Sequence, residues 1–395
     1  MRDLQIIYLA TVRMPGRRAH SIQIIRTCEA LQRLGAKTIL IVPKRRKELG
    51  ENLVSFYGLS VRPTVIKVPT IDLLEKARNK ENAYLILVFT FYLFALPLLI
   101  ILKLSGKTVI YLRERILLLL TWLTKPFHLL PTVYEMHELP KFTGIMRKIQ
   151  KIALHTCKKI VTISKFQEKL LKKTGFPESR ITVIHDAADE RIYIREESRE
   201  DLRRRLNLPI NKIIITYSGQ LSRWKNPEFI VDALKYVKNE NVVLLFVGGS
   251  REDIKRLRKY AERVNVKEKI ILKGYVRPSE VGRYLKASDI LIHYSMTIGD
   301  MASFSPLKLF EYMLSGKPLL APDYPYIKEI IQENVNGFLF NHTDPRSLAK
   351  LIEKVLKMDE EEVRKIVERA KSIAEKEYTY TARAKKILET ITQGM

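Results

Sequence analysis

Apolar, β-rich runs alternate with amphipathic stretches along almost the whole chain, and this alternation constrains the fold more than any other feature. Strands that alternate with helices predict a parallel sheet that helices cover on both faces. In the first half of the chain the expected strands are Gln5–Ala10, Lys37–Val42, Tyr84–Phe89, Thr108–Leu112, Thr132–Glu135, Lys159–Ile163 and Thr182–Ile184. In the second half they are Ile213–Tyr217, Val242–Val247, Ile270–Leu272, Ile290–Ile292 and Pro318–Ala321.

Two such series in one chain predict two domains. A length of 395 residues is more than one ordinary hydrophobic core holds. The stretch Glu190–Asn211 is charged and has no strand pattern, which is typical of a join between domains. We therefore expect an α/β fold of two Rossmann-like, doubly wound parallel-sheet domains facing an interdomain cleft. They would cover residues 1–190 and 191–378, with a helix over 379–395 packing back on the first domain.

The chain is strongly basic, with a formal net charge of +27, and the charge is clustered. Lys44–Lys47 is wholly basic, and Lys141–Lys173 has Glu168 as its only acidic residue. Clustered basic charge favours an anionic partner, whereas a solvated surface of a heat-adapted protein is the alternative. The sequence has no RNP-type aromatic motif or other known nucleic-acid module, so nucleic-acid binding is the weaker alternative and we expect no such partner.

Cysteine content and the start of the chain predict a cytoplasmic protein. Cys28 and Cys157 are the only cysteines, too few for a disulfide framework, and this favours a reducing compartment. Met1–Asp3 runs directly into the strand-like Leu4–Leu9, so we expect no signal peptide.

One uncharged segment, Ala83–Leu102, is long enough to cross a bilayer. Pro97 interrupts it, and a buried strand followed by an apolar helix would give the same hydropathy, which is the interpretation we favour. Phe91–Leu102 and Ile116–Leu123 still carry more apolar residues than a helix covering one sheet face requires. With the nearby basic clusters, this surplus predicts peripheral contact with the anionic inner face of the cell membrane.

The segment Ser303–Glu311 predicts an anion site at the start of a helix. Ser305 is a good N-cap and Pro306 suits the first helical position, so the helix should run from Pro306 to Ser315. Lys308 then opposes the helix dipole in the first turn, which is resolved if a phosphate occupies the helix N-terminus.

Glu311 lies three residues after Lys308, on the same face of the expected helix. Its carboxylate could accept hydrogen bonds from the hydroxyls of a ribose next to that phosphate. The alternative is a plain surface pair between Lys308 and Glu311.

A second basic loop, Gly219–Pro227, lies between an expected strand and an expected helix. Glycine lets the backbone approach a ligand closely, and the Arg223 and Lys225 side chains can reach a diphosphate. Asn226 could cap the following helix. The alternative is a basic loop with a helix cap.

Polar residues also follow the strands of the first half, where a doubly wound sheet places its ligand crevice. His20 and His137 are candidate contacts for a sugar, and Arg113 and Glu114 are candidates for the acceptor side. The sequence shows no metal-ligand cluster with sensible spacing, no GxGxxG or P-loop fingerprint and no GxSxG motif, so we expect no metal and no cofactor.

The order and spacing of these segments resemble a GT-B glycosyltransferase of family 4 (GT4), the retaining group, over nearly the whole length. The segments that carry the resemblance are Pro15–Pro43, Tyr134–Glu138, Val161–Ser164, Val183–Asp189, Gly219–Lys225, Ser303–Glu311 and Asn336–Phe340. The resemblance implies a transferase that uses a sugar nucleotide such as a UDP- or GDP-sugar. The alternative is a sugar-nucleotide epimerase of the same fold.

The resemblance also implies roles for individual residues. Lys225 would hold the donor diphosphate and Glu311 the ribose, while His137 would face the transferred sugar. The implied donor-binding residues are Gly16, Gly219, Arg223, Lys225, Tyr275, Ser303, Ser305, Pro306, Leu307, Lys308 and Glu311. Gln220 and Ser303 depart from the family, which usually has Arg and often Glu at these positions. The acceptor would be a lipid-linked glycan, a polysaccharide or a small molecule.

Overall fold

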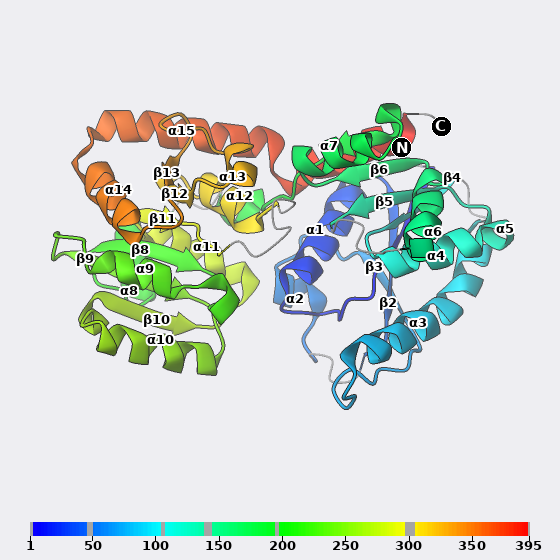
Figure 1. The fold of residues 1–395 in the computed structure, drawn as a ribbon, viewed down its shortest axis with the longest axis horizontal. Coiled ribbons are helices and arrows are strands. Elements are labelled where there is room, and N and C mark those ends of the chain that lie inside the picture. Colours follow the sequence, from blue (N-terminus) through cyan, green and yellow to red (C-terminus); the bar gives the residue numbers. More distant parts are fainter. Residues whose placement is uncertain are drawn as a thin grey trace. The chain divides into compact units, whose positions relative to one another are not determined.

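The computed structural model describes residues 3–45, 50–103, 107–137, 144–193, 197–296 and 305–393. The chain divides into two compact units, each with its own parallel sheet (Figure 1). Unit 1 comprises Met1–Asp186, Ser303–Ser305 and Tyr380–Met395. Unit 2 comprises Ala187–Ala302 and Pro306–Thr379. The division falls close to the expected join near residue 190, and the C-terminal helix groups with unit 1.

Unit 1 has a seven-stranded sheet in the order β3-β2-β1-β4-β5-β6-β7, with every neighbouring pair parallel. The strands are β1 (Leu4–Leu9), β2 (Lys37–Pro43), β3 (Thr64–Val68), β4 (Lys107–Leu112), β5 (Thr132–Met136), β6 (Lys159–Thr162) and β7 (Ile181–Val183). The helices are α1 (Ala19–Arg33), α2 (Leu53–Tyr57), α3 (Lys80–Leu102), α4 (Arg115–Leu123), α5 (Lys125–His128), α6 (Gly144–His155), α7 (Lys165–Lys173), η2 (Glu178–Arg180) and α16 (Tyr380–Thr392). The order reverses between β1 and β4, which is where doubly wound sheets bind ligands.

The predicted strand Tyr84–Phe89 is wrong, because these residues belong to α3, a continuous helix of 23 residues. The Asn79 side chain accepts a hydrogen bond from the Asn82 amide at 3.0 Å and caps the helix. Pro97 lies inside the helix without ending it. Only about a third of its apolar window is buried, and by length and composition alone α3 could cross a membrane. The expected division of Ala83–Leu102 into a strand and a helix is therefore no argument against contact between this segment and a membrane.

Unit 2 has a six-stranded parallel sheet in the order β10-β9-β8-β11-β12-β13. The strands are β8 (Ile213–Ser218), β9 (Val242–Val247), β10 (Ile270–Gly274), β11 (Ile290–Ile292), β12 (Leu319–Pro322) and β13 (Phe338–Phe340). The helices are η3 (Glu190–Tyr193), α8 (Arg199–Arg205), η4 (Arg223–Lys225), α9 (Glu228–Leu234), α10 (Arg251–Arg263), η5 (Lys267–Lys269), α11 (Pro278–Ala287), α12 (Leu307–Leu314), α13 (Pro325–Lys328), α14 (Pro345–Lys357) and α15 (Glu360–Glu377).

The other predicted strands are confirmed, and two strands were missed. β3 and β13 are edge strands of five and three residues. Only one residue of β3, Val68, is buried, and the charged Lys67 interrupts its apolar residues Val65, Ile66 and Val68. β13 is too short for a periodic pattern.

An aromatic stack fixes the chain just after β11. The rings of Phe229 and Tyr294 are parallel, with centroids 4.2 Å apart, and Phe340 stacks beside both. Such ring pairs contribute about 1 kcal/mol beyond the area they bury. Because Tyr294 is held in this core, its neighbours His293 and Ser295 point to the other side of the extended chain, toward the loop after β8.

Candidate functional site

Gly219, directly after β8, leaves the space that the Lys308 side chain fills. A Cβ atom on Gly219 would lie 2.1 Å from Lys308 Nζ, and the residue has a φ of +124°. Only glycine combines that backbone conformation with so close an approach. The loop and the helix α12 were predicted separately as phosphate contacts, and the structure brings them together.

Two tyrosines hold Lys308 and its helix against β8. The Lys308 ammonium donates to the Tyr217 hydroxyl at 3.1 Å and lies 4.3 Å from the centre of that ring. The Ser218 amide donates to the Tyr312 hydroxyl at 2.8 Å and so ties α12 to the end of the strand. Both tyrosine side chains are buried, which makes the position of Lys308 a rigid one.

Lys225 approaches the same region from η4. Its ammonium donates to the Ser295 hydroxyl at 3.0 Å and lies 4.0 Å from the centre of the Trp224 ring. Arg223, the other predicted diphosphate contact, is exposed. The second basic loop therefore contributes one half-buried cation, Lys225, and one solvent-facing cation, Arg223.

The two lysines form a site that favours an anion. Burial, together with the charge of Lys308, lowers the pKa of Lys225 to about 7. Burial also lowers the pKa of Lys308 to about 8, against the opposing effect of Glu311. Because each ammonium is partly desolvated and repels the other, a diphosphate placed beside them would stabilise both charges.

Glu311 shares the helix α12 with Lys308 and is half-buried. Burial raises its pKa to about 7; Lys308 opposes the shift and Asp189 adds to it. Neither Lys308–Glu311 nor Lys225–Glu311 is an ion pair within 4.0 Å among the described residues. A plain surface pair between Lys308 and Glu311, the alternative left open by the sequence, is therefore wrong, and the carboxylate can accept hydrogen bonds from a ligand.

His293 belongs to this region, although the sequence did not single it out as a site residue. It is 3% exposed, and both ring nitrogens lack a hydrogen-bond partner among the described residues. Burial, with the charges of Lys308 and Lys225, holds its pKa well below the ordinary value, so the ring is neutral. Its position directly after β11, at the carboxyl edge of the sheet, was the available signal.

The predicted start of α12 needs correction. The helix begins at Leu307 with Pro306 as its N-cap residue, one position later than expected. Ser305 is not the N-cap, because its hydroxyl instead accepts a hydrogen bond from the Asp186 amide at 2.9 Å. Ser303 lies outside the described residues.

Three further predictions about loop residues have different outcomes. Asn226 does not cap α9, because it adopts a left-handed conformation and Pro227 is the N-cap residue. Tyr275 directly follows β10 and its side chain is 45% exposed, and its predicted contact with the donor stays a prediction. In unit 1, the Gly16 amide donates to the Tyr57 hydroxyl at 2.6 Å, so that N–H is already engaged.

A buried charged cluster lies in unit 1 around Glu135 of β5. The Arg383 guanidinium, from α16, donates to Glu135 at 2.6 Å, and Tyr111 and His137 also bond to this carboxylate. Burial would raise the pKa of Glu135, but Arg383 and His137 hold it well below its ordinary value. Burial and Arg113 lower the pKa of His137 to about 4, so His137 is neutral near pH 7. Glu135 thus fixes the ring of the histidine that the sequence predicts to face the sugar.

Gln23 of α1 links this cluster to the end of β7. It donates to the Asp186 carboxyl and accepts a hydrogen bond from Arg113 at 2.7 Å. Burial raises the pKa of Asp186 to about 7, although Arg383 opposes the shift. His20, in the first turn of α1, has a pKa lowered to about 4 by burial and by Arg113. The sequence-predicted group His20, Arg113 and His137 therefore does come together.

Glu114 has a mainly structural environment. Its carboxylate accepts hydrogen bonds from the Thr11 amide at 2.9 Å and the Thr11 hydroxyl at 3.2 Å. These bonds tie the ends of β1 and β4 together.

The charges of the unit 1 cluster do not suit a divalent cation. Glu135, His137 and Asp186 offer ligand-type atoms within 4.8 Å of one another. The Arg383 guanidinium, however, lies 2.6 Å from Glu135 and 3.9 Å from Asp186. A fixed guanidinium at those distances already neutralises the carboxylates and would repel a metal ion.

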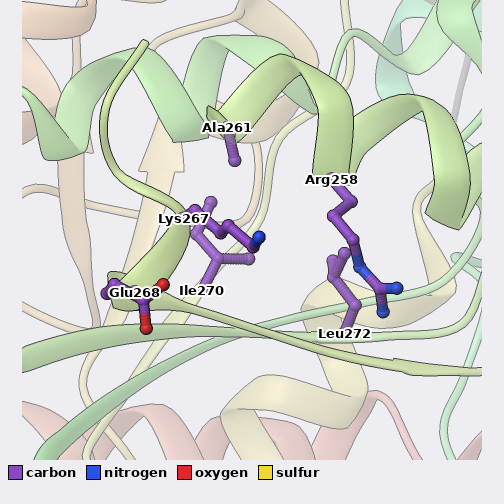
Figure 2. Close-up of a pocket in the computed structure, with 6 residues that line it drawn as sticks. All are labelled: Arg258, Ala261, Lys267, Glu268, Ile270 and Leu272. Carbon is purple, nitrogen blue, oxygen red and sulfur yellow. The ribbon is translucent and has the colours of Figure 1, made fainter. Parts of the chain in front are cut away.

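A cavity of roughly 230 Å³ lies elsewhere in unit 2, between α10 and the start of β10 (Figure 2). It is lined by Arg258, Ala261, Lys267, Glu268, Ile270 and Leu272. Ile270 is the first residue of β10, so the cavity lies at the amino edge of the sheet. Lys225 and Lys308 lie in segments that follow the carboxyl ends of β8 and β11. Doubly wound folds bind ligands at that edge of the sheet, so it is the better candidate for the ligand site.

Two family models cover most of the chain. The model described as glycosyl transferases group 1 matches residues 198–373, and the model described as Glycosyltransferase Family 4 matches residues 21–191. The chain is 28% identical over 160 residues to the alpha-monoglucosyldiacylglycerol synthase of Streptococcus pneumoniae, across 40% of this chain and 35% of that protein. It is 24% identical over 194 residues to the UDP-Gal:alpha-D-GlcNAc-diphosphoundecaprenol alpha-1,3-galactosyltransferase of Escherichia coli, across 48% of each. These matches span half or less of the relatives' own lengths.

Solved structures match the chain over its whole length. HepE of Anabaena in complex with UDP has a TM-score of 0.75 and 18% identity, covering 98% of this chain and 100% of that one. The sucrose-phosphate synthase of Thermosynechococcus elongatus has a TM-score of 0.73 and 17% identity, covering 99% and 98%. At these identities the likeness is one of fold, and the fold is GT-B. From the two family models together with this fold, the chain belongs to the group 1, family 4 glycosyltransferases.

Proposed function

We propose that the protein transfers a sugar from a nucleotide-diphosphate donor to an acceptor with retention of anomeric configuration, and that unit 2 binds the donor. The observation that carries the proposal is the convergence of Lys225 and Lys308 beside Gly219, with Glu311 on the helix that bears Lys308. Two partly desolvated ammonium groups suit a diphosphate, and a half-buried carboxylate suits ribose hydroxyls.

In the proposed reaction the bond between the anomeric carbon and the donor diphosphate breaks, and the acceptor hydroxyl bonds to that carbon from the same face. The acceptor proton passes to the departing diphosphate. Lys225 and Lys308 stabilise the negative charge that develops there. Neither lysine is a nucleophile in this scheme, and their two charges do the work that a metal ion does elsewhere, so transfer should continue in excess EDTA.

We propose a uridine nucleotide as the donor and a lipid-linked or membrane-proximal acceptor. HepE, which shares the fold, was crystallised with UDP and with UDP-glucose. The Streptococcus pneumoniae relative is named for a diacylglycerol glycolipid and the Escherichia coli relative for a diphosphoundecaprenol acceptor. A cytoplasmic protein held peripherally on the inner face of the cell membrane would meet both substrates.

The test is transfer of a labelled sugar by Lys225→Ala and Glu311→Ala variants, with Lys238→Ala, an exposed lysine of unit 2, as the control. Both site variants should lose most transfer while their unfolding curves stay close to that of the unchanged protein. Full activity in both would contradict the assignment. Incubation with the donor alone separates an epimerase, which would convert the donor without any acceptor.

A further inference from the structure

The outer side of α3 carries a row of exposed apolar side chains. Figure 1 shows α3 on the outside of unit 1, and α3 contacts α4 and α5. The exposed large side chains of these elements, with the turn that follows α5, are Leu85, Ile86, Phe89, Leu93, Phe94, Ile100, Ile101, Leu123, Phe127 and Leu129. We call this set the outer apolar face. Leu93, Ile101 and Phe127 are each more than 60% exposed.

The opposite side of α3 already packs against the core of unit 1. Leu87, Phe91 and Leu99 are fully buried, at the spacing of one helical stripe. A surface helix of a soluble domain normally has a polar outer side, whereas α3 is apolar on both. Because the inner stripe is held in the core, α3 cannot cross a bilayer while unit 1 stays folded.

The polar groups of α3 indicate whether the outer apolar face contacts lipid or another protein. Tyr84, Thr90 and Tyr92 carry the only side-chain hydroxyls between Ala83 and Leu102. Tyr84 is bonded to Thr11 at 3.1 Å, and Tyr92 to the hydroxyl of Thr124 at 2.6 Å.

Thr90 donates to the Ile86 carbonyl at 2.8 Å, within its own helix. Every hydroxyl of the helix is therefore satisfied inside unit 1. Protein interfaces use about one hydrogen bond per 100–200 Å², and the hydroxyls of α3 are not available for such bonds. Lipid hydrocarbon, in contrast, requires that the polar groups of a protein be bonded within the protein itself.

The charges around α3 complement an anionic leaflet. Lys76, Arg78 and Lys80 are exposed before the helix and in its first turn, and Lys103 and Lys107 follow its last turn. From residue 76 to residue 129 the sequence has two acidic residues, Glu81 and Glu114, and Glu114 is bonded to Thr11. Basic residues at both ends can reach lipid phosphates while the helix between them lies in the plane of the surface.

We propose that the outer apolar face inserts into one leaflet of an anionic membrane, with α3 lying in the membrane plane. The inference deepens the membrane location proposed above. It differs from attraction by the basic clusters alone, because burial of apolar side chains resists salt.

The test is co-sedimentation of the full chain with vesicles of phosphatidylcholine and phosphatidylglycerol, at low salt and at about 0.5 M NaCl, where charges are screened within a few ångströms. The variant is Phe89→Gln/Leu93→Gln/Ile101→Gln, since glutamine is a good helix former. The matched control replaces three exposed apolar residues of unit 2: Ile210→Gln/Tyr236→Gln/Val335→Gln. UDP binding and unfolding curves show whether each variant keeps its fold and its donor site.

The unchanged protein and the control should stay on the vesicles in high salt. Under the same condition, the apparent affinity of the α3 variant for the vesicles should be roughly tenfold lower, or lower still. Residual low-salt binding of the variant through its basic residues also fits. The proposal is overturned if the unchanged protein stays in solution with anionic vesicles at low salt, or if the α3 variant binds as well as the control in high salt. A lipid-free dimer that the α3 substitutions dissociate would overturn it in favour of a second copy of the chain. Loss of lipid binding with intact UDP binding separates this surface from the donor site.

Discussion

At the scale of one residue, Gly219 makes room for the Lys308 side chain in the proposed donor site. Its φ of +124° and the 2.1 Å separation between a Cβ and Lys308 Nζ are two distinct obstacles to any side chain. Backbone strain of this kind costs about 1–3 kcal/mol. The clash with the ammonium would in addition displace the group that we expect to hold the diphosphate.

We expect Gly219→Ala to weaken UDP binding by at least about tenfold, because Lys308 must move away. Isothermal titration calorimetry measures the affinity, and a urea unfolding curve measures the cost in stability. Gly316→Ala is the control, since Gly316 also has a positive φ, of +67°, but nothing within 4 Å of a Cβ. Equal effects of the two substitutions on UDP affinity would show that strain, and not the contact with Lys308, is responsible.

At the scale of an element, α16 ties the end of the chain into unit 1. Arg383 is 1% exposed and donates to Glu135 at 2.6 Å and to the Ile184 carbonyl at 3.0 Å. These bonds join α16 to β5 and to the end of β7. Removing one partner of a buried ion pair leaves an uncompensated charge, and this costs about 3–5 kcal/mol.

Arg383→Met should therefore lower the free energy of unfolding of unit 1 by about 3 kcal/mol or more. Lys385→Met, an exposed neighbour on the same helix, should change it little. The double variant Arg383→Met/Glu135→Gln should recover part of the loss, because it removes the unpaired carboxylate as well. Urea unfolding followed by far-UV circular dichroism measures all three, and a double variant less stable than Arg383→Met would contradict this account.

At the scale of the whole molecule, the two units have separate hydrophobic cores and separate sheets, so a single two-state transition is not required. The proposed donor residues Lys225, Lys308 and Glu311 all lie in unit 2. A ligand stabilises the part of a protein that binds it, by about 2.7 kcal/mol at 100 times its dissociation constant.

UDP should thus raise the calorimetric transition of unit 2 and leave that of unit 1 nearly unchanged at pH 7. The free pKa values of Lys225 and Lys308 are about 7 and 8, and a bound anion raises both. At a pH between these pKa values and about 10, the complex therefore binds more protons than the UDP-free protein. UDP affinity then falls as the pH rises from 7 to 9. At constant UDP concentration, the increase in the transition temperature of unit 2 should shrink over the same range. A shift that grows with pH, or one confined to unit 1, would exclude this donor site.

The sequence by itself determined the alternation of strands and helices and the number of domains, and it singled out Lys225, Lys308 and Glu311 as the residues that we propose for the donor site. These follow from local pattern, because period, glycine position and the residues after each strand are properties of short segments. Tertiary structure decided the rest. Tyr84–Phe89 could form a strand by propensity, but in the folded chain it belongs to a capped helix that packs only one stripe of side chains into the core.

Ser305 lost its predicted capping role to a hydrogen bond with Asp186, 119 positions away. Arg383 and Glu135 are 248 positions apart, and no local pattern pairs them. The exposure of the outer apolar face could not be read from composition either, since a buried apolar helix has the same hydropathy. Burial and long-range pairing are settled only when the whole chain has packed, which is why these features needed the structure.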